Sequence, residues 1–238
     1  MKPHFRDYMI SLWQLFSGFR THGEERIRDE GRRDITPYLE ISPSLRVLDL
    51  ANGRLWPQYL LLKTEFRHVY GIDLMNRPKR TWTDRGYQVA RWLYSRHIHR
   101  SPKSSWEKTL VCGDVGLLPY RDNYFDLITS VAAFEHFLQV SAVVSEMHRV
   151  MRPGGVAYIR IHLFSCLSGA HNLGFTEIPL RTIPSGVEAW DHLRKRRLPL
   201  YVPLNEWRIE QYLTAFTRHF EILKNYCAMR EGEESIPT

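Results

Sequence analysis

The chain has 238 residues, 43% of them hydrophobic, which is enough for one well-buried α/β domain with additions. Its three cysteines lie far apart and lack metal-ligand spacing, so neither a disulfide framework nor a cysteine metal site is expected. The odd cysteine count without a framework predicts a cytoplasmic protein, since the cytosol is reducing. No apolar run is long enough to cross a bilayer, and no signal peptide is recognisable. The formal net charge of +7 agrees with a nucleic acid, an anionic membrane, an acidic small molecule or a solvated surface, and does not distinguish them.

Residues 5–19 carry apolar, mostly aromatic side chains at the three-and-four spacing of one helix face. They are Phe5, Tyr8, Met9, Leu12, Trp13, Phe16 and Phe19. We expect this face to pack on the domain, and the alternative is an amphipathic segment that rests on a membrane. A charged stretch at 22–34 follows as a helix or linker, so residues 1–44 are predicted to form an N-terminal helical cap.

From residue 45 onward, short apolar runs alternate with helical patterns. The runs predicted to be strands are 46–50, 69–74, 109–112, 125–131, 156–161 and 220–226. Runs that are apolar without strict alternation are typical of a parallel sheet covered by helices on both faces. A helix is predicted to end at Pro153, and Asn205 is predicted to cap a helix that contains Ile209. The sequence therefore predicts one α/β domain over residues 45–238.

Two segments of this domain are long enough to be insertions, at 76–108 and 163–204. Within the first, residues 84–100 form a predicted basic helix that also carries tryptophan and tyrosine. The second is rich in Pro, His, Trp and Arg and includes the basic run 194–197. Because loops at the carboxyl ends of parallel strands build the binding site in such sheets, we expect the second insertion to determine substrate specificity. Its basic run could receive a phosphate or carboxylate of an acceptor, or an RNA backbone.

The most specific pattern lies at residues 114–155. Its parts, in chain order, are Asp114 after an apolar run, Leu118-Pro119-Tyr120, Phe125-Asp126, Glu135-His136 and Pro153-Gly154-Gly155. The whole segment resembles the second half of a class I S-adenosylmethionine-dependent methyltransferase domain, of the methyltransferase type 11 kind. The resemblance implies a Rossmann-like three-layer α/β/α sandwich with a mostly parallel sheet. Sheets of this family end with two antiparallel strands, and only residues 220–226 offer one here, so we expect the last edge strand to be missing.

The resemblance assigns the cofactor, S-adenosylmethionine, to acidic residues that end successive apolar runs. Asp73 would accept hydrogen bonds from both ribose hydroxyls, because a carboxylate presents two acceptor oxygens. Asp114 would lie at the adenine amino group, with Val115 adding a backbone contact. Asp49 would lie near the cationic methionine end. Leu74, next to Asp73, belongs to the same expected cofactor-binding set.

The glycine loop after the first apolar run departs from the family pattern. The family usually has acid-apolar-Gly-x-Gly-x-Gly, whereas this chain has Asp49-Leu50-Ala51-Asn52-Gly53-Arg54-Leu55. We expect Ala51, Asn52 and Gly53 to hold the methionine part of the cofactor along an altered path, since glycine and asparagine tolerate left-handed backbone geometry. The alternative is a filled pocket in a non-catalytic relative, with Leu55 as the largest departure.

Methyl transfer from a sulfonium requires alignment of the acceptor and, for a hydroxyl acceptor, removal of a proton. The best candidate base is His136, because histidine ordinarily titrates near neutral pH, and the alternative is a structural histidine bonded to the backbone. Further residues that could face the acceptor come after the fifth predicted strand, namely His162, His171, Asp191 and His192. No metal is expected.

We therefore expect a methyltransferase that methylates oxygen on a small-molecule, glycan or lipid-linked acceptor, and the oxygen assignment depends on His136. One alternative is a catalytically degenerate methyltransferase-like protein that acts as a binding partner or scaffold. An RNA methyltransferase ranks lower, because no RNA-binding module is recognisable in the sequence. Peripheral membrane contact through residues 5–19 stays open, and the sequence gives no indication of the oligomeric state.

Overall fold

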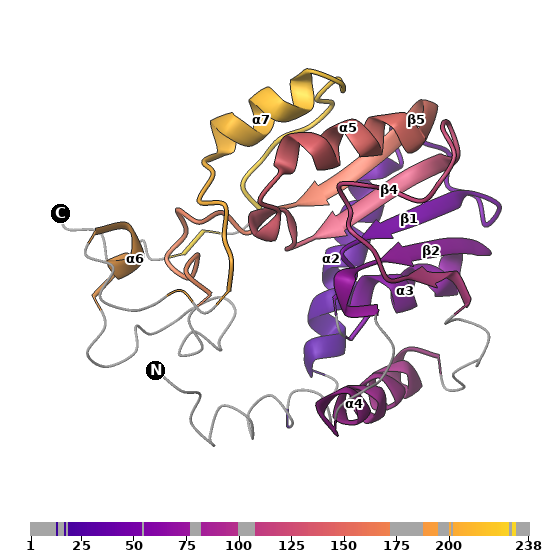
Figure 1. Cartoon of the computed structure of the whole chain (residues 1–238). Coiled ribbons are helices and arrows are strands. Elements are labelled where there is room, and N and C mark those ends of the chain that lie inside the picture. The colour runs from indigo at the N-terminus through magenta and orange to yellow at the C-terminus, as the bar shows by residue number, and fades with distance from the viewer. Residues whose placement is uncertain are drawn as a thin grey trace.

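The computed structural model describes residues 19–53, 55–76, 82–99, 108–171, 188–194 and 202–228, and also Trp13, Ser17, Leu200, Arg230 and Glu231. Its centre is a sheet whose strand pairings are all parallel among the described residues (Figure 1). The strands are β1 (Arg46–Leu50), β2 (His68–Ile72), β3 (Leu110–Val111), β4 (Phe125–Val131) and β5 (Met151–Arg160). Their order is β3-β2-β1-β4-β5, so the chain builds the sheet outward from β1 in one direction and then returns to place β4 on its other side.

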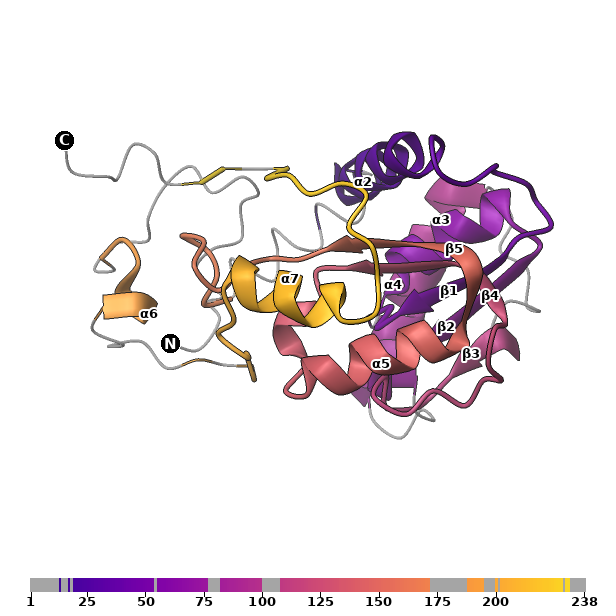
Figure 2. The same ribbon diagram turned by 90° about the horizontal axis from the view of Figure 1, so that it is seen from above.

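Helices cover both faces of the sheet, which gives three layers (Figures 1 and 2). One face carries α2 (Phe19–Ile35), α3 (Pro57–Glu65) and α4 (Trp82–His99), and the other carries α5 (Val140–Val150) and α7 (Ile209–Thr217). The short elements η1 (Leu74–Asn76), η3 (Phe134–His136) and α6 (Asp191–Arg194) lie in the connections. The expected Rossmann-like α/β/α sandwich with a parallel sheet is confirmed.

Each face of the sheet has its own apolar core, because successive strand residues point to opposite faces. Leu48 of β1 belongs to the core that contains Met147 of α5 and Phe216 of α7. Its neighbour Val47 belongs to the core that contains Tyr59 of α3. Since both faces are buried, the strands need apolar residues at consecutive positions, and this is the reason for the continuous apolar runs in the sequence.

The predicted sixth strand at 220–226 is wrong. This segment is extended but pairs with no strand, and the described part of the sheet ends at β5. Its side chains bind α2 instead: Lys224 Nζ lies 2.6 Å from an oxygen of Asp34, and the Tyr226 hydroxyl donates to the other oxygen at 2.7 Å. The Tyr38 hydroxyl donates to the carbonyl of Leu223 at 3.3 Å. The segment therefore crosses from α7 to α2, as Figure 2 shows.

The fifth strand begins earlier than predicted. It starts at Met151, directly after α5 ends at Val150, whereas the sequence predicted a helix that continues to Pro153 and a strand from 156. Phe125 pairs with Met151 and Leu127 pairs with Val156, so the register shifts between the two pairs. The residues between Met151 and Val156 bulge out of the ladder, which places the proline where no ladder hydrogen bond is required of it.

Asn205 does not cap α7, contrary to the prediction. The position before the helix is occupied by Arg208, whose backbone N–H bonds the Gln211 side chain at 2.9 Å. The Asn205 amide instead donates to the carbonyls of Phe134 and Phe137 at 2.7 and 2.9 Å, and its oxygen accepts from the Tyr212 hydroxyl at 2.8 Å. This residue thus connects α7 to η3.

The remaining helical predictions fall partly on described residues. The predicted basic helix at 84–100 corresponds to α4, and the charged stretch at 22–34 lies within α2. The aromatic helix predicted at 5–19 lies outside the described residues except for Trp13, Ser17 and Phe19, and Trp13 is 62% exposed. None of the described helices combines the length and apolar character that crossing a bilayer requires. The boundary at 44, and the limits of the insertions at 76–108 and 163–204, stay predictions.

Candidate active site

The candidate site lies at the carboxyl ends of β1, β2 and β4. In the strand order, β1 stands between β2 and β4, and this is the point where the connections of the sheet change direction. In open parallel sheets, ligands bind outside the carboxyl ends of the strands at such a point. The three strands also supply the residues on which the sequence prediction depends.

Asp49 is a buried carboxylate next to the end of β1, with only 2% of its surface exposed. The Thr129 hydroxyl donates to its Oδ1 at 3.0 Å, and its Oδ2 has no hydrogen-bond partner among the described residues. Burial raises the pKa of Asp49 to about 7, although the Thr129 hydrogen bond acts in the opposite direction. A nearby positive charge would favour the carboxylate form, and the ammonium and sulfonium groups of the expected cofactor have that charge. The site therefore fits the cationic end of S-adenosylmethionine.

The loop after β1 is left-handed at two positions where the sequence has no glycine. Ala51 has φ 55° and Trp56 has φ 56°, while Gly53 has φ 66°. The backbone N–H of Ala51 donates to the carbonyl of Ile72 at 2.8 Å, which ties the loop to the end of β2. Left-handed backbone at a residue with a side chain is strained, and such strain gathers at functional sites. Ala51 thus keeps a backbone geometry for which the family usually uses glycine.

Side-chain amides hold this loop in place, and the sequence reasoning missed two members of the set. The amides of Asn52 and Asn76 bond each other reciprocally at 3.3 and 3.2 Å. The Trp56 indole N–H donates to Asn76 Oδ1 at 3.0 Å, and the Asn76 amide donates to the carbonyl of Val111 at 2.9 Å. Asn76 therefore joins the ends of β2 and β3 to the altered glycine loop. The sequence signal that could have identified Asn76 was its position, three residues after Asp73 at the end of a predicted strand.

Asp73 organises the neighbouring turn. Its Oδ2 accepts the backbone N–H of Gly53 at 2.8 Å, and its Oδ1 accepts the backbone N–H of Met75 at 2.6 Å. Each carboxylate oxygen keeps a second lone pair, which a ribose hydroxyl can use. Both bonds fix the orientation of the carboxylate, so the structure fits the ribose role that the resemblance implies.

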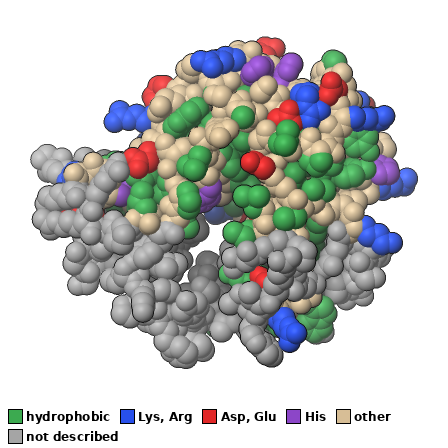
Figure 3. Space-filling model, in the orientation of Figure 1, with side chains coloured by type: hydrophobic (Ala, Val, Ile, Leu, Met, Phe, Trp, Pro, Cys, Tyr) green, Lys and Arg blue, Asp and Glu red, His purple; other side chains and the backbone are tan. Residues whose placement is uncertain are grey.

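The expected adenine side combines an ordered acid with exposed apolar residues. Asp114 accepts the backbone N–H of Gly116 at 2.8 Å, and Val115 is buried. Leu74, Met75 and Leu117 are 65%, 44% and 79% exposed. Hydrophobic side chains reach the surface in several places on the face shown in Figure 3. The flat face of an aromatic base such as adenine is the kind of ligand surface that would cover side chains at this edge.

His136 is held in η3 with one ring nitrogen occupied. Its Nδ1 lies 3.0 Å from the carbonyl of Pro203, and because a carbonyl only accepts, Nδ1 carries the hydrogen. The lone pair of the neutral ring is therefore on Nε2. The His136 ring meets the edge of His171 at a centroid distance of 4.8 Å, and His171 stacks on His162 at 4.7 Å. The fold thus gathers three histidines that the sequence had placed only in separate segments.

The other two residues proposed to face the acceptor have different environments. His192 is 4% exposed, and its Nε2 lies 2.8 Å from the carbonyl of Phe164, which makes it a buried structural histidine. Asp191 begins α6 and is also buried, at 5% exposed. Of the basic run 194–197, only Arg194 belongs to the described residues.

Glu135 is a buried residue of the site. It belongs to the motif at residues 114–155, but the sequence predicted no functional role for it. It is 1% exposed, and its Oε2 accepts the backbone N–H of His162 at 3.4 Å. Its Oε1 has no hydrogen-bond partner among the described residues and lies 3.8 Å from Nε2 of His171. Burial raises the pKa of Glu135 to about 7 and lowers that of His171 to about 3.

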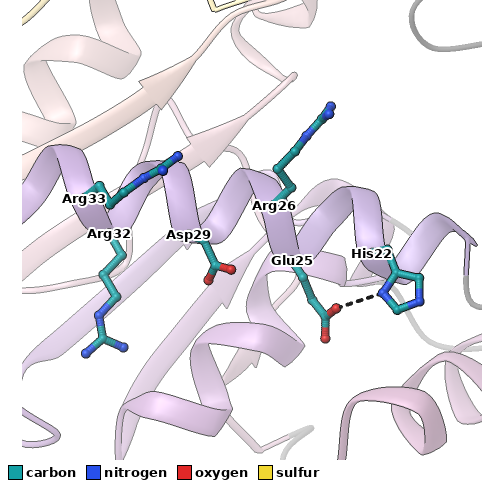
Figure 4. A pocket seen from close by; sticks show the side chains of 6 residues that line it. All are labelled: His22, Glu25, Arg26, Asp29, Arg32 and Arg33. Carbon is teal, nitrogen blue, oxygen red and sulfur yellow. Dashed lines mark hydrogen bonds and ion pairs between the residues drawn. The ribbon is translucent and has the colours of Figure 1, made fainter.

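Two cavities border α2. One is a depression of about 510 Å³ along α2, lined by His22, Glu25, Arg26, Asp29, Arg32 and Arg33. Figure 4 shows that these side chains come from one helix and point to different sides of it, so the depression is an open polar surface. The other holds about 30 Å³ between α2, α3 and the sheet, room for roughly one water molecule. Neither cavity is lined by Asp49, Asp73 or Asp114.

Comparison with known proteins agrees with this geometry. Residues 48–159 match the family model described as a methyltransferase domain. This segment is a class I methyltransferase domain. It begins within β1 and ends within β5, so all strands of the described sheet contribute to it. S-adenosylmethionine is the cofactor of the family.

The curated relatives of the domain include enzymes with different acceptors. A sterol 24-C-methyltransferase of Gibberella zeae is 31% identical over 117 residues, which are 49% of this chain and 27% of that protein. A glycine/sarcosine/dimethylglycine N-methyltransferase of Actinopolyspora halophila is 30% identical over 117 residues, 49% of this chain and 18% of that protein. The ubiquinone/menaquinone C-methyltransferase UbiE of Neisseria meningitidis is 29% identical over 85 residues, 34% of this chain and 35% of that protein. The chain spans well under half the length of these relatives.

Proposed function

We propose that this chain transfers a methyl group from S-adenosylmethionine to an acceptor bound beside η3. The observation that carries the proposal is Asp49, a buried carboxylate at the switch point of the sheet, one oxygen of which has no hydrogen-bond partner in the part of the chain that the structure describes. A buried carboxylate with a raised pKa is a poor structural element unless a positive ligand accompanies it. The cofactor supplies such a charge together with an activated methyl group.

In this proposal the residues of the loop and of the strand ends hold the cofactor. The backbone of Ala51, Asn52 and Gly53 surrounds its methionine part, and the left-handed geometry of Ala51 and Gly53 supports a retained loop path. Asp73 accepts the ribose hydroxyls with the lone pairs that its backbone partners leave free. Leu74, Asp114 and Val115 flank the adenine. The residues that make these contacts are Asp49, Ala51, Asn52, Gly53, Asp73, Leu74, Asp114 and Val115.

His136 is the proposed base for the acceptor. The Pro203 carbonyl fixes its tautomer, so Nε2 carries the lone pair that would accept a proton from an acceptor hydroxyl during methyl transfer. Leu138, which follows two residues later in the chain, is an apolar side chain that is 70% exposed. An exposed apolar side chain so close in the chain to the base suits a lipid-linked or small-molecule acceptor better than a glycan or RNA.

The acceptor atom in the proposal is oxygen, with carbon as the second candidate. The names of two relatives, a sterol and a ubiquinone/menaquinone C-methyltransferase, favour carbon and also favour lipid acceptors. A 13C-labelled methyl donor separates the two, because the chemical shift of a methyl group on oxygen differs strongly from that of one on carbon. Product analysis against a panel of hydroxylated and prenylated lipids therefore identifies both the acceptor and the atom.

Cofactor binding distinguishes the enzyme from a degenerate binding protein. We expect isothermal titration calorimetry to show one molecule of S-adenosylmethionine bound per chain. Asp73→Ala should lower the affinity at least about 100-fold, because it removes the ribose contacts and releases Gly53. Asp29→Ala is the matched control, since Asp29 lies on α2 with its side chain 58% exposed and pairs with Arg28 of the same helix.

Two results would contradict the proposal. No binding at millimolar cofactor would make the chain a non-enzymatic relative. If Asp73→Ala bound S-adenosylmethionine as tightly as the unmodified protein does, the cofactor would not lie at the end of β2. A cytoplasmic location and membrane contact through residues 5–19 stay predictions.

A further inference from the structure

Glu135, His162 and His171 form a cluster at the carboxyl ends of β4 and β5. Glu135 lies in η3, His162 follows β5 by two residues, and His171 ends the described segment 108–171. Each offers one ligand atom, and these atoms lie within 4.8 Å of one another. Two imidazoles and a carboxylate are a ligand set of transition-metal sites in proteins.

Two atoms of the cluster lack the partners that buried polar atoms normally have. Glu135 Oε1 and His171 Nε2 are both buried, and neither has a hydrogen-bond partner among the described residues. They lie 3.8 Å apart, too far for a direct hydrogen bond. Glu135 is 1% exposed, so solvent does not satisfy its oxygen. A cation between the two atoms would satisfy both.

His162 is oriented by a chain of hydrogen bonds behind it. The Ser168 hydroxyl donates to Glu231 Oε2 at 2.5 Å, so its oxygen is left to accept from Nε2 of His162 at 2.8 Å. The backbone N–H of Ser168 donates to the same carboxylate at 3.2 Å. With the hydrogen on Nε2, the lone pair of His162 is on Nδ1. Histidines that bind metals usually have such a carboxylate-backed hydrogen bond on the other ring nitrogen.

The two imidazoles of the cluster are in the protonation state that binds a metal, whereas burial raises the pKa of Glu135 to about 7, so its carboxyl group would release its proton on binding an ion. Burial lowers the pKa of His171 to about 3, with the neighbouring His162 and His136 acting in the same direction. Burial lowers the pKa of His162 as well. Both rings are therefore neutral near pH 7, and the neutral imidazole is the form that binds a metal.

We propose that Glu135, His162 and His171 bind one divalent transition-metal ion, for which Zn²⁺ is the best-fitting probe. Donor atoms of one tetrahedral Zn²⁺ lie about 3.4 Å apart, given bonds of about 2.0–2.1 Å. Atoms now within 4.8 Å of one another must close by at most about 1.5 Å, which small ring rotations achieve. Three protein ligands leave at least one position open to water or to an oxygen of the acceptor. His136 is not a ligand in this proposal, because it serves as the base.

Calorimetric titration of Zn²⁺ into the chelator-treated full chain, without a histidine tag, tests the site. We expect saturable binding of one ion per chain. His171→Ala and Glu135→Gln should each lower the affinity at least about 100-fold, since a bidentate remainder of the site binds far more weakly. His148 and His219 serve as the control, because they are exposed histidines outside the cluster whose ring centroids lie 5.2 Å apart. The double variant His148→Gln/His219→Gln should bind Zn²⁺ as the unmodified protein does.

A second measurement covers the case in which Glu135→Gln fails to fold. Co²⁺ in place of Zn²⁺ should give visible absorption bands of a tetrahedral or five-coordinate site, and His171→Ala, whose side chain lies near the surface at 21% exposed, should lose them. The proposal is overturned if the unmodified protein shows no saturable one-to-one binding, or if His162→Ala and His171→Ala both bind Zn²⁺ like the unmodified protein. Titration of S-adenosylmethionine on the same samples separates this result from the proposed methyltransferase activity.

Discussion

At the scale of single residues, the burial of Asp49 determines how the site responds to pH. A carboxyl group with a raised folded-state pKa holds its proton more tightly in the folded protein than in the unfolded chain. Its contribution to folding stability therefore falls as the pH rises from its ordinary value of 3.8 to about 7. A cationic ligand beside the carboxylate reverses this, because it favours the ionised form. Asp49 thus links cofactor binding to proton release.

The affinity for S-adenosylmethionine should consequently increase with pH. Between pH 6 and pH 8 we expect a rise of about tenfold, which corresponds to one proton lost from a group with a pKa of about 7. Calorimetry at several pH values measures it. Asp49→Asn should bind more weakly and with a nearly flat pH dependence. A steep dependence retained in Asp49→Asn would assign the proton to another group.

The strain at Ala51 gives a second prediction at this scale. Ala51→Gly should stabilise the protein by about 1 kcal/mol, because glycine adopts φ 55° without the steric conflict of a Cβ atom. Thermal unfolding should show a midpoint higher by about 2–4 °C. The control is Ala133→Gly, because Ala133 has φ −136°, which an alanine adopts without strain. This substitution should only lower the stability, since glycine increases the conformational entropy of the unfolded chain. Destabilisation by Ala51→Gly would show that the left-handed geometry is not strained.

At the scale of elements, Arg149 holds the loop between β3 and β4 against α5. Its guanidinium donates to both carboxylate oxygens of Glu146, to Asp122, and to the carbonyls of Leu118 and Tyr120, all at 2.7–2.8 Å. Glu146 also accepts the backbone N–H of Leu118 at 2.7 Å. Arg149 thus binds the Leu-Pro-Tyr turn, and both belong to the sequence motif at residues 114–155.

Arg149→Lys should therefore loosen this loop without changing the charge. A lysine ammonium has three donors and no fork geometry, so at least two of the five hydrogen bonds are lost. We expect the free energy of unfolding to fall by about 1–3 kcal/mol, and hydrogen exchange at Leu118 and Tyr120 to become faster. Arg218→Lys, on the exposed end of α7, is the control that should change neither. Unchanged exchange in Arg149→Lys would mean that packing alone holds the loop.

At the scale of the whole molecule, the segment after α7 connects the two helical layers. It leaves the layer of α5 and α7 and ends against α2 on the other face, where Asp34 binds Lys224 and Tyr226. The sequence predicted this extended segment to be a strand, because it is a short apolar run that follows a helix. Within the described residues this segment binds α2 and does not pair with β5.

Asp34→Ala should detach this segment. We expect faster hydrogen exchange over residues 220–226 and a loss of about 1 kcal/mol in unfolding free energy, mainly from the Tyr226 hydrogen bond, because the Lys224 side chain is 51% exposed and screened by solvent. Exchange in α5 should not change. Tyr226→Phe should reproduce most of the effect. If the exchange of 220–226 is the same in both variants and the unmodified protein, the contact with Asp34 does not hold the segment.

The sequence by itself determined the order of the strands along the chain, the layers, and the acids at the strand ends. These features depend on local periodicity and on turn residues next to each strand, which a single chain displays directly. Asp49, Asp73 and Asp114 lie at the ends of such runs, and the resemblance to the methyltransferase family selected them as cofactor-binding residues.

Only the tertiary structure decided which side chains meet at that edge. The Asn52–Asn76 pair, the group of Glu135, His162 and His171, and the binding of 220–226 to α2 join residues far apart in the chain. No local pattern encodes such contacts, since loop paths and packing on the sheet bring the partners together. The sequence thus determined the family and the edge at which the site lies, and the tertiary structure determined the chemistry assembled there.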